Sequence, residues 1–335
     1  MSTGSDIERL ADGFRRDFDA LKHEIGKVVV GQPDVIEGVL TALVAGGHVL
    51  LEGLPGTGKT VLVQTLADVL DLGFQRIQCT PDLMPTDIIG TYVIMESAQG
   101  RRSFEFQKGP LFSNLVLVEQ INRTTPKTQS ALLEAMDEES ITVSTERFGL
   151  PRPFFLAATQ NPLEMEGTYP LPEAQIDRFF FKLLVRPPGC DEMEEILART
   201  TEARSAFTKI TRKIVDGARI GEMSELVRRI PIPADVRRWG ISVVAATHPD
   251  GKRAPGSVRK YVRYGCGPRG AQAMVLAAKI RAVLEGRCDV STADIRSVSH
   301  AALRHRVIFN FEGLGEDIDP DTILDDVLDA VAEPG

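Results

Sequence analysis

The first half of the chain alternates short, continuous apolar runs with segments of helical spacing. Leu62, Leu66, Val69 and Leu70, for example, recur at the spacing of one helix face. Continuous apolar strands that are separated by helices are typical of a parallel sheet covered by helices on both faces. The sequence therefore predicts an α/β domain whose strands are residues 48–51, 76–79, 115–118, 154–158 and 179–185.

The second half of the chain has a mainly helical pattern. The composition changes at residues 186–189, where two prolines precede a glycine, and we place the domain boundary there. Residues 1–189 are expected to form the α/β domain, and residues 190–335 a linker helix followed by a helical domain. In this second part, Leu276, Ile280, Val283 and Leu284 share a helix face, and Gly286 is expected to follow the end of that helix.

Composition and charge narrow the class of protein. The 335 residues carry 39 Lys and Arg against 47 Asp and Glu, a formal net charge of −8 at pH 7. Because nucleic-acid binding rests on a cationic surface, a nucleic-acid partner is not expected. No apolar stretch reaches the ~18 residues of a membrane span, and the polar N-terminus does not resemble a signal peptide. The four scattered cysteines are typical of reduced thiols, so the sequence predicts a cytoplasmic protein.

A glycine-rich loop separates the predicted strand 48–51 from the helix that follows it. Residues 53–60 read Gly-Leu-Pro-Gly-Thr-Gly-Lys-Thr and fit the phosphate-loop pattern G-x-x-x-x-G-K-[ST]. The glycines let backbone N–H groups turn toward phosphate oxygens, and the helix N-terminus adds partial positive charge. Lys59 would reach the β- and γ-phosphates, and Thr60 would offer its hydroxyl to Mg²⁺. The candidate nucleotide-binding residues here are Gly53, Pro55, Gly56, Thr57, Gly58, Lys59, Thr60 and Val61.

A P-loop protein also needs a carboxylate at the end of a neighbouring strand to hold Mg²⁺. The run 115–118 is followed by Glu119 and Gln120, where P-loop ATPases of this type usually have Asp and Glu. We expect Glu119 to serve the metal together with Thr60. Gln120 stands where the residue that polarises the attacking water is usual, and an amide does not accept a proton near neutral pH. The sequence thus predicts binding of ATP and Mg²⁺ with slow hydrolysis, unless another carboxylate or a water network replaces Gln120.

Further motifs follow one another in a fixed order along the chain. They are residues 29–32, 78–90, 121–136, 158–162, 171–179, 267–269 and 303–306. Together they resemble the motifs of MoxR-type AAA+ ATPases over nearly the whole length. The resemblance implies an AAA+ P-loop αβα sandwich with a parallel sheet, followed by a smaller all-helical lid domain. It also implies that Val30 and Gly31 lie near adenine, with ATP held between the core and the lid.

The resemblance assigns two sensor residues. Asn161, at a strand end, would contact the γ-phosphate or the attacking water; the alternative is a polar turn residue before Pro162. Arg269 would be a second sensor that moves with the lid onto the γ-phosphate; the alternative is a structural residue in the first turn of a helix.

Two further arginines are candidates for contacts between subunits. Arg178 would be the arginine finger inserted into the neighbouring subunit's site, because a planar guanidinium neutralises charge on phosphate oxygens. The alternative is a salt bridge with Asp177 or Glu173. Arg123 is either a second trans-acting arginine or an interface charge, and the sequence does not decide between them.

Two insertions are expected to be β-hairpins. Residues 92–95 and 104–106 flank a turn at 98–101. Residues 141–143 and the run from Phe154 flank a second insertion before Asn161. In the family that the chain resembles, such insertions face the central pore or the client; the alternative is an ordinary surface hairpin.

The resemblance also implies a function. MoxR-like proteins form rings, here expected to be a hexamer, and act beside von Willebrand factor A-domain proteins in the maturation of partner protein complexes. Two hypotheses stay open: a working ATPase with chaperone-like activity on a protein client, or an ATP-gated assembly subunit that barely hydrolyses ATP. Gln120 favours the second, whereas Lys59, Asn161, Arg178 and Arg269 favour a functional site. The acidic charge disfavours a DNA motor.

Overall fold

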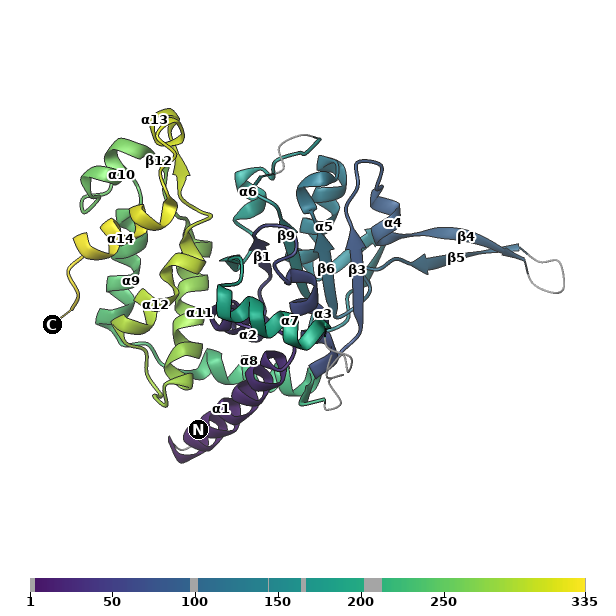
Figure 1. Cartoon of the computed structure of the whole chain (residues 1–335), viewed down its shortest axis with the longest axis horizontal. Helices are drawn as coiled ribbons and strands as arrows, with labels where there is room; N and C mark the ends of the chain where they lie inside the picture. Colours follow the sequence, from purple (N-terminus) through teal and green to yellow (C-terminus); the bar gives the residue numbers. More distant parts are fainter. Residues whose placement is uncertain (1–3, 97–101, 144, 164–166, 202–212, 335) are drawn as a thin grey trace.

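The computed structural model describes residues 4–96, 102–143, 145–163, 167–201 and 213–334. An α/β core lies beside a helical lid, and a long two-stranded arm extends from the core on the side away from the lid (Figure 1). This confirms the predicted fold class. Among the described residues, no helix combines the length and apolar character that crossing a bilayer requires.

The core sheet has five parallel strands in the order β10–β1–β9–β6–β3. All five lie where the apolar runs predict them, with end shifts of at most two residues. Because the strands are parallel, the carboxyl ends of β1, β9 and β6 meet at one edge of the sheet. The strands are β1 (Val49–Glu52), β3 (Phe74–Gln78), β6 (Leu115–Glu119), β9 (Phe155–Gln160) and β10 (Phe181–Leu184).

Alternate strand residues point into two separate hydrophobic cores, as the two-residue period of a strand requires. Leu51 and Leu117 join the core that contains α1, α2 and α3, whereas Leu50 and Val118 join the core that contains α4 and α5. Helices therefore cover both faces of the sheet. The core helices are α1 (Gly4–Gly26), α2 (Pro33–Ala45), α3 (Lys59–Val69), α4 (Pro85–Ile89), α5 (Pro126–Glu138) and α6 (Glu173–Ile176), with the 3₁₀ turn η1 (Ile121–Arg123).

Both insertions are hairpins, but the second differs from its prediction. The arm pairs β4 (Gly90–Glu96) with β5 (Arg102–Lys108), and the turn predicted at 98–101 lies outside the described residues. In the second hairpin, β7 (Ser140–Val143) pairs with β8 (Glu146–Gly149), whereas Phe154 leads into β9 of the main sheet. The return strand is polar and exposed, so it has no apolar run to mark it. Stacking of Phe106 on Phe148, with 4.5 Å between ring centroids, joins the two hairpins.

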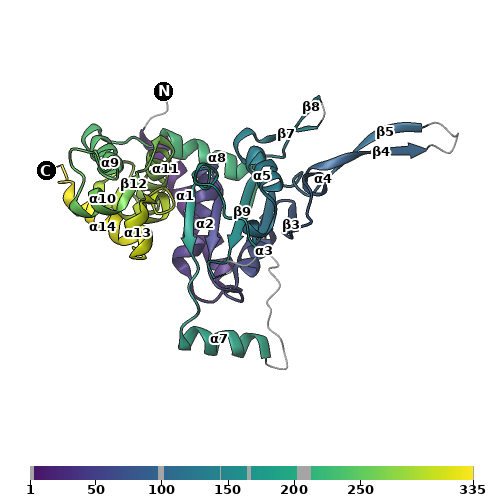
Figure 2. The same cartoon turned by 90° about the horizontal axis from the view of Figure 1, so that it is seen from above.

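The lid is a bundle of helices after the core. Its first helix, α7, begins at Cys190, directly after the predicted boundary; its ribbon lies at the periphery in Figure 2, and its Arg199 donates to the carbonyl oxygen of Lys27 at 2.6 Å. α8 packs on α1 and α2, and β11 pairs with β2 of the core, so the division at residue 189 stays a prediction. Gly286 follows α11 with φ 79°, as expected for a residue beyond a helix end. The elements are α7 (Cys190–Thr201), α8 (Gly217–Arg229), α9 (Ala234–Ala246), α10 (Gly256–Tyr261), α11 (Pro268–Leu284), α12 (Thr292–Leu303), α13 (Phe311–Gly315), α14 (Pro320–Ala330), β2 (Leu70–Asp71), β11 (Val215–Asp216), β12 (Val262–Tyr264) and β13 (Ile308–Phe309).

The lid is tied to the core at the segment that leads into β10. Arg306 is buried; it donates to the carbonyl oxygen of Phe179 (2.7 Å) and to Oδ1 of Asp177 (2.8 Å). His305 contacts the same Phe179 oxygen at 3.0 Å. Because a buried charge needs its partners, these contacts hold α12 against the core.

A buried histidine makes the stability of the core depend on pH. His48 accepts a hydrogen bond from the N–H of Leu156 at Nδ1 (3.0 Å) and donates from Nε2 to the carbonyl of Met136 (3.2 Å). Both ring nitrogens are therefore satisfied in the neutral form. Burial lowers the pKa of His48 to about 4, below its ordinary 6.5. Burial also lowers the pKa of His305.

We expect the free energy of unfolding to fall as the pH drops from about 6.5 toward 4. In this window the unfolded chain binds a proton that the folded His48 refuses, so stability is complete above pH 6.5 and lost below it. The loss due to His48 is on the order of 2–3 kcal/mol by pH 4. In urea unfolding experiments at several pH values across this range, the free energy of unfolding should change less with pH for His48→Gln than for the wild type. The exposed control His23→Gln should keep the full pH dependence. Equal pH dependence in the wild type and His48→Gln would contradict the assignment.

Candidate functional site

The predicted phosphate loop lies between β1 and α3, as the sequence indicates. Gly56 and Gly58 have φ of 79° and 85°, in the left-handed region that favours glycine. Gly53 has no room for a side chain, since an added Cβ would lie 2.4 Å from the carbonyl oxygen of Val185. The backbone conformation and packing of the loop therefore require glycine at these three positions.

Lys59 reaches back over this loop from the first turn of α3. Its Nζ donates to the carbonyl oxygens of Gly53 (2.9 Å) and Leu54 (2.7 Å) and contacts Oγ1 of Thr57 at 3.2 Å. Partial burial lowers the pKa of Lys59, against the opposing field of Glu119. The ammonium is thus positioned at the mouth of the loop, where phosphate oxygens would meet it.

Thr60 and Glu119 form the candidate magnesium site. The Thr60 hydroxyl donates to Oε1 of Glu119, whose Oε2 accepts from Nε of Arg76 at 2.7 Å. A hydroxyl and a carboxylate are hard oxygen donors of the kind that Mg²⁺ prefers. The longer Glu side chain therefore still brings its oxygen to Thr60, and this pair fits the metal that a P-loop site uses.

Two of the predicted catalytic residues, Gln120 and Asn161, lie in the same cavity as the P-loop. This cavity has a volume of about 350 Å³, and its lining includes Glu119, Gln120 and Asn161 at the ends of β6 and β9. Gln120 is in the left-handed region (φ 55°), and its N–H donates to Oγ1 of Thr159 (2.9 Å). Asn161 is buried, and its Oδ1 accepts from the N–H of Leu163 at 3.2 Å. Pro55 and Val61 line this cavity too.

A smaller apolar cavity of about 210 Å³ adjoins the P-loop. Val30 lines it, and a place for Val30 near adenine stays a prediction. The other lining residues that were not predicted as site residues are Lys27, Val28, Val29, Gln32, Pro188, Ile196, Arg199 and Thr200. Gly31 does not line it; Gly31 has φ 69° and faces Glu192, whose carboxylate an added Cβ would meet. Gln32 donates from Nε2 to the carbonyl of Thr57 (3.0 Å), which ties this segment to the P-loop. An apolar cavity beside a phosphate site suits a nucleotide base.

Arg178 and Arg269 lie together, away from this site. Both pair with Asp137 at 3.2 Å, and Arg269 also lies 3.8 Å from Oδ2 of Asp177. Of the residues that the structure describes, neither arginine lines the P-loop cavity. In this structure α11 begins beside the ends of α5 and α6, which places Arg269 against Asp137 and Asp177. The expectation that Arg269 moves with the lid onto the γ-phosphate stays a prediction.

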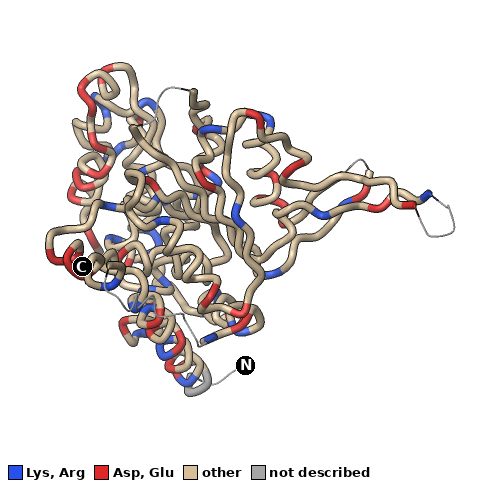
Figure 3. Tube along the Cα trace, turned by 45° about the vertical axis from the view of Figure 1, so that its right-hand side comes forward, with Lys and Arg blue, Asp and Glu red and all other residues tan. Residues whose placement is uncertain are grey.

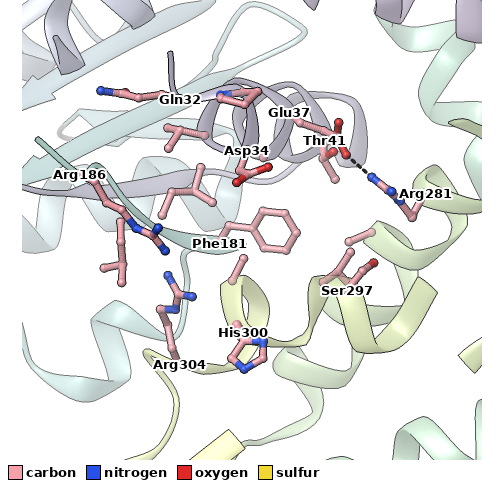
Figure 4. Close-up of a pocket in the computed structure, with 18 of the residues that line it drawn as sticks. Gln32, Asp34, Glu37, Thr41, Phe181, Arg186, Arg281, Ser297, His300 and Arg304 are labelled. Carbon is pink, nitrogen blue, oxygen red and sulfur yellow. Dashed lines mark hydrogen bonds and ion pairs between the residues drawn. The ribbon is translucent and has the colours of Figure 1, made fainter. Parts of the chain in front are cut away.

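The cleft between core and lid is a separate cavity of about 670 Å³ (Figure 4). Its walls come from α2, β10, α11 and α12, and its only described residue shared with the cavity beside the P-loop is Gln32. Two arginines that line it are paired: Arg281 bonds Glu37 (2.7 Å), and Arg304 bonds Asp321 (2.9 and 2.8 Å). The expectation that ATP lies between core and lid stays a prediction; the cavity beside the P-loop is itself lined by core residues and by Ile196, Arg199 and Thr200 of α7.

Comparisons with known families and proteins agree with these features. The family described as "ATPase family associated with various cellular activities (AAA)" matches residues 48–181, and an AAA lid domain family matches residues 257–327. "Chaperone MoxR1" of Mycobacterium tuberculosis is 37% identical over 327 residues, which cover 97% of this chain and 85% of that protein. "Protein MoxR" of Methylorubrum extorquens is 30% identical over 317 residues, with 90% and 91% covered.

Two further relatives match the chain along nearly its full length. The protein YeaC of Bacillus subtilis, which is uncharacterised, is 38% identical over 317 residues, covering 94% of each chain. A crystal structure of a Cytophaga hutchinsonii protein superposes with a TM-score of 0.90 at 37% identity and covers 99% of each chain. The arrangement of core and lid is therefore shared with a solved structure.

Proposed function

Because the chain belongs to the MoxR family of AAA+ ATPases, we propose that it binds ATP with Mg²⁺ in the P-loop cavity and uses this to remodel partner proteins. One observation carries the proposal: three segments far apart in the sequence line one cavity at the carboxyl ends of the strands, and they contribute Lys59 and Thr60, Glu119 and Gln120, and Asn161. The smaller apolar cavity that adjoins the P-loop would hold the nucleotide base.

The residues of the site divide the work of binding. Backbone N–H groups of the loop and the start of α3 would face the phosphates, and Lys59 would exchange loop carbonyls for phosphate oxygens. Thr60 and Glu119 would hold Mg²⁺, which when bound neutralises charge on the β- and γ-phosphates. Asn161, whose Oδ1 is engaged by Leu163, has its amide N–H groups left to donate to the γ-phosphate.

We propose that hydrolysis at this site is slow. Gln120 lines the cavity where an attacking water would be activated, and its amide orients water but does not take its proton. This favours a second candidate function, an ATP-gated assembly subunit whose bound nucleotide persists. In both candidates the chemical step is hydrolysis of ATP to ADP and phosphate, and they differ in its rate.

We also propose that a neighbouring subunit completes the site in a ring, with six members as the expectation. Arg178 and Arg269 share Asp137 and do not line their own subunit's P-loop cavity in the described part of the chain. The side chains of Arg178 and Arg269 are 30% and 47% exposed, so a neighbouring copy could contact both. Two guanidinium groups on one surface suit the phosphates of an adjacent copy.

The arm is the candidate contact with a client protein. Its outer part exposes Ile94, Met95 and Phe104, the last to 76%. Basic and acidic residues are interspersed along the trace, in the arm as in the body, which gives no support to nucleic acid as the partner (Figure 3). Relatives of this chain are named chaperone or MoxR, and a von Willebrand factor A-domain partner stays a prediction. The proposal places the protein in the cytoplasm, where its four free cysteines would stay reduced.

Substitution of Lys59 tests nucleotide binding. Lys59→Ala is expected to weaken the affinity for Mg–ATP by ~10- to 100-fold, because a charged hydrogen-bonding group at the phosphates is lost. Isothermal titration calorimetry of purified protein measures this, with Lys252→Ala in an exposed loop as the matched control. Wild-type affinity in Lys59→Ala would refute the site.

A further inference from the structure

The edge strand β3 lies beside β6, whose end carries the two exchanged residues Glu119 and Gln120. In the register of this pair, Arg76 lies opposite Leu117 and Gln78 opposite Glu119. Arg76 and Gln78 are two residues apart on β3, so their side chains leave the same face of the sheet. Both make hydrogen bonds to the end of β6.

Arg76 holds one oxygen of Glu119. Its Nε donates to Oε2 at 2.7 Å, and an Nη lies 2.5 Å from the same oxygen. Arg76 is half-exposed and does not line the P-loop cavity in the described residues, whereas the Glu119 side chain is 10% exposed. The guanidinium therefore binds Oε2 of Glu119 from outside the cavity, and Oε1 of Glu119 accepts the hydrogen bond from Thr60. This removes rotational freedom that the extra methylene of Glu would otherwise give.

Arg76 also fixes the orientation of two side-chain amides, Gln78 and Gln120, which form a chain of hydrogen bonds with it; we call this chain the relay. Its Nη donates to Oε1 of Gln78 (3.2 Å), and Nε2 of Gln78 donates to Oε1 of Gln120 (3.0 Å). Because a guanidinium has donors only, the oxygen of Gln78 must face Arg76 and its NH₂ must face Gln120. Gln120 then accepts with its oxygen, and its NH₂ is left for the cavity.

We propose that Arg76 and Gln78 are positioning residues that aim an oxygen of Glu119 at Mg²⁺ and the N–H donors of Gln120 at the terminal phosphate. Gln120 then binds the anionic γ-phosphate as a donor, which makes the site prefer ATP over ADP. This inference rests on the proposed function of the same cavity and adds to it the residues that set its response to the metal and to the third phosphate.

The first part of the proposal, here called the metal branch, is that Arg76 positions Glu119 for Mg²⁺. It is tested by calorimetry with the non-hydrolysable analogue AMP-PNP, in Mg²⁺ and in EDTA. In Mg²⁺, Arg76→Ala is expected to weaken AMP-PNP binding ~10-fold, because a metal ligand loses its hydrogen-bond partner. In EDTA the same change should weaken AMP-PNP binding by no more than ~3-fold, because only the salt-screened attraction of the Arg76 charge is lost. Gln75→Ala, exposed on the same strand, is the matched control and should bind as the wild type does in both conditions. Equal losses in Mg²⁺ and EDTA would overturn this branch.

The second part, here called the amide branch, is that Gln78 positions Gln120. It is tested by the ratio of AMP-PNP affinity to ADP affinity. Gln78→Met keeps the side-chain size and removes the relay, so the ratio should fall ~5-fold, about one hydrogen bond. In a Gln120→Ala background the same change should have no further effect, because its target is gone. An effect that persists without Gln120 would overturn the relay.

Failure of this inference is distinguishable from failure of the proposed function. If the wild type shows no nucleotide binding that depends on Lys59, the proposed function itself falls. If the wild type binds and the Arg76 and Gln78 variants match it in all four measurements, only the positioning roles fall. Circular dichroism melting of each variant confirms that the compared proteins are folded.

Discussion

Replacement of Gln120 by glutamate is expected to raise the rate of ATP hydrolysis by ~10²-fold, the usual contribution of a positioned general base. The new carboxylate has nearly the shape of the amide that it replaces. Nε2 of Gln78, which donates to Oε1 of Gln120 at 3.0 Å, has an acceptor to meet in either case. The side chain therefore stays in the cavity and gains the ability to take a proton from water.

Steady-state phosphate release measures this gain. Gln120→Ala serves as the control, because it removes the amide without supplying a base and should not exceed the wild-type rate. A wild-type rate that already equals that of Gln120→Glu would show that another carboxylate or a water network activates the water, and the slow-hydrolysis proposal would be abandoned.

Arg178→Ala is expected to lower hydrolysis by ~10³-fold, the low end of the effect of an arginine finger. Within the described part of its own chain, Arg178 donates a hydrogen bond to the carbonyl of Leu133 (2.7 Å) and forms an ion pair with Asp137. The sequence offers Asp177 and Glu173 as structural partners of Arg178, whereas the observed partner is Asp137. Such half-exposed pairs contribute only about 0–1 kcal/mol to stability.

The size of the loss therefore separates catalysis from folding. Single-turnover release of labelled phosphate detects the slow wild-type reaction and its decrease. Arg186→Ala, in the exposed segment before α7, is the matched control and should keep the wild-type rate. A decrease in rate that merely follows a decrease in melting temperature would argue against a finger.

Local chemistry made the centre of this protein predictable from its sequence. The five strands are buried apolar runs, and the phosphate loop needs glycine at Gly56 and Gly58 for its left-handed backbone. Helix α1 was not predicted, although Phe14 and Phe18 lie fully buried in the core. Its apolar residues are separated by many charged ones, which gave the segment the composition of a polar terminus.

Features that depend on how distant segments pack could not be predicted. The place of Arg269 follows from the docking of the lid through Arg306 onto Phe179, a contact between segments more than 100 residues apart. The cavity beside the P-loop likewise needs Ile196 from α7, a helix whose position no local pattern sets. The partners of Glu119 and Gln120 on β3 were also missed, because strand register was not deduced.

A mixing experiment tests most directly whether the site is shared between neighbouring copies. Lys59→Ala and Arg178→Ala are each expected to be inactive, one through its own cavity and the other through the cavity of its neighbour. In rings mixed from equal amounts, about a quarter of the interfaces would join an intact Lys59 to an intact Arg178, so about a quarter of the wild-type rate should return. Mixed rings, verified by native mass spectrometry, that stay as inactive as their parents would contradict the shared site.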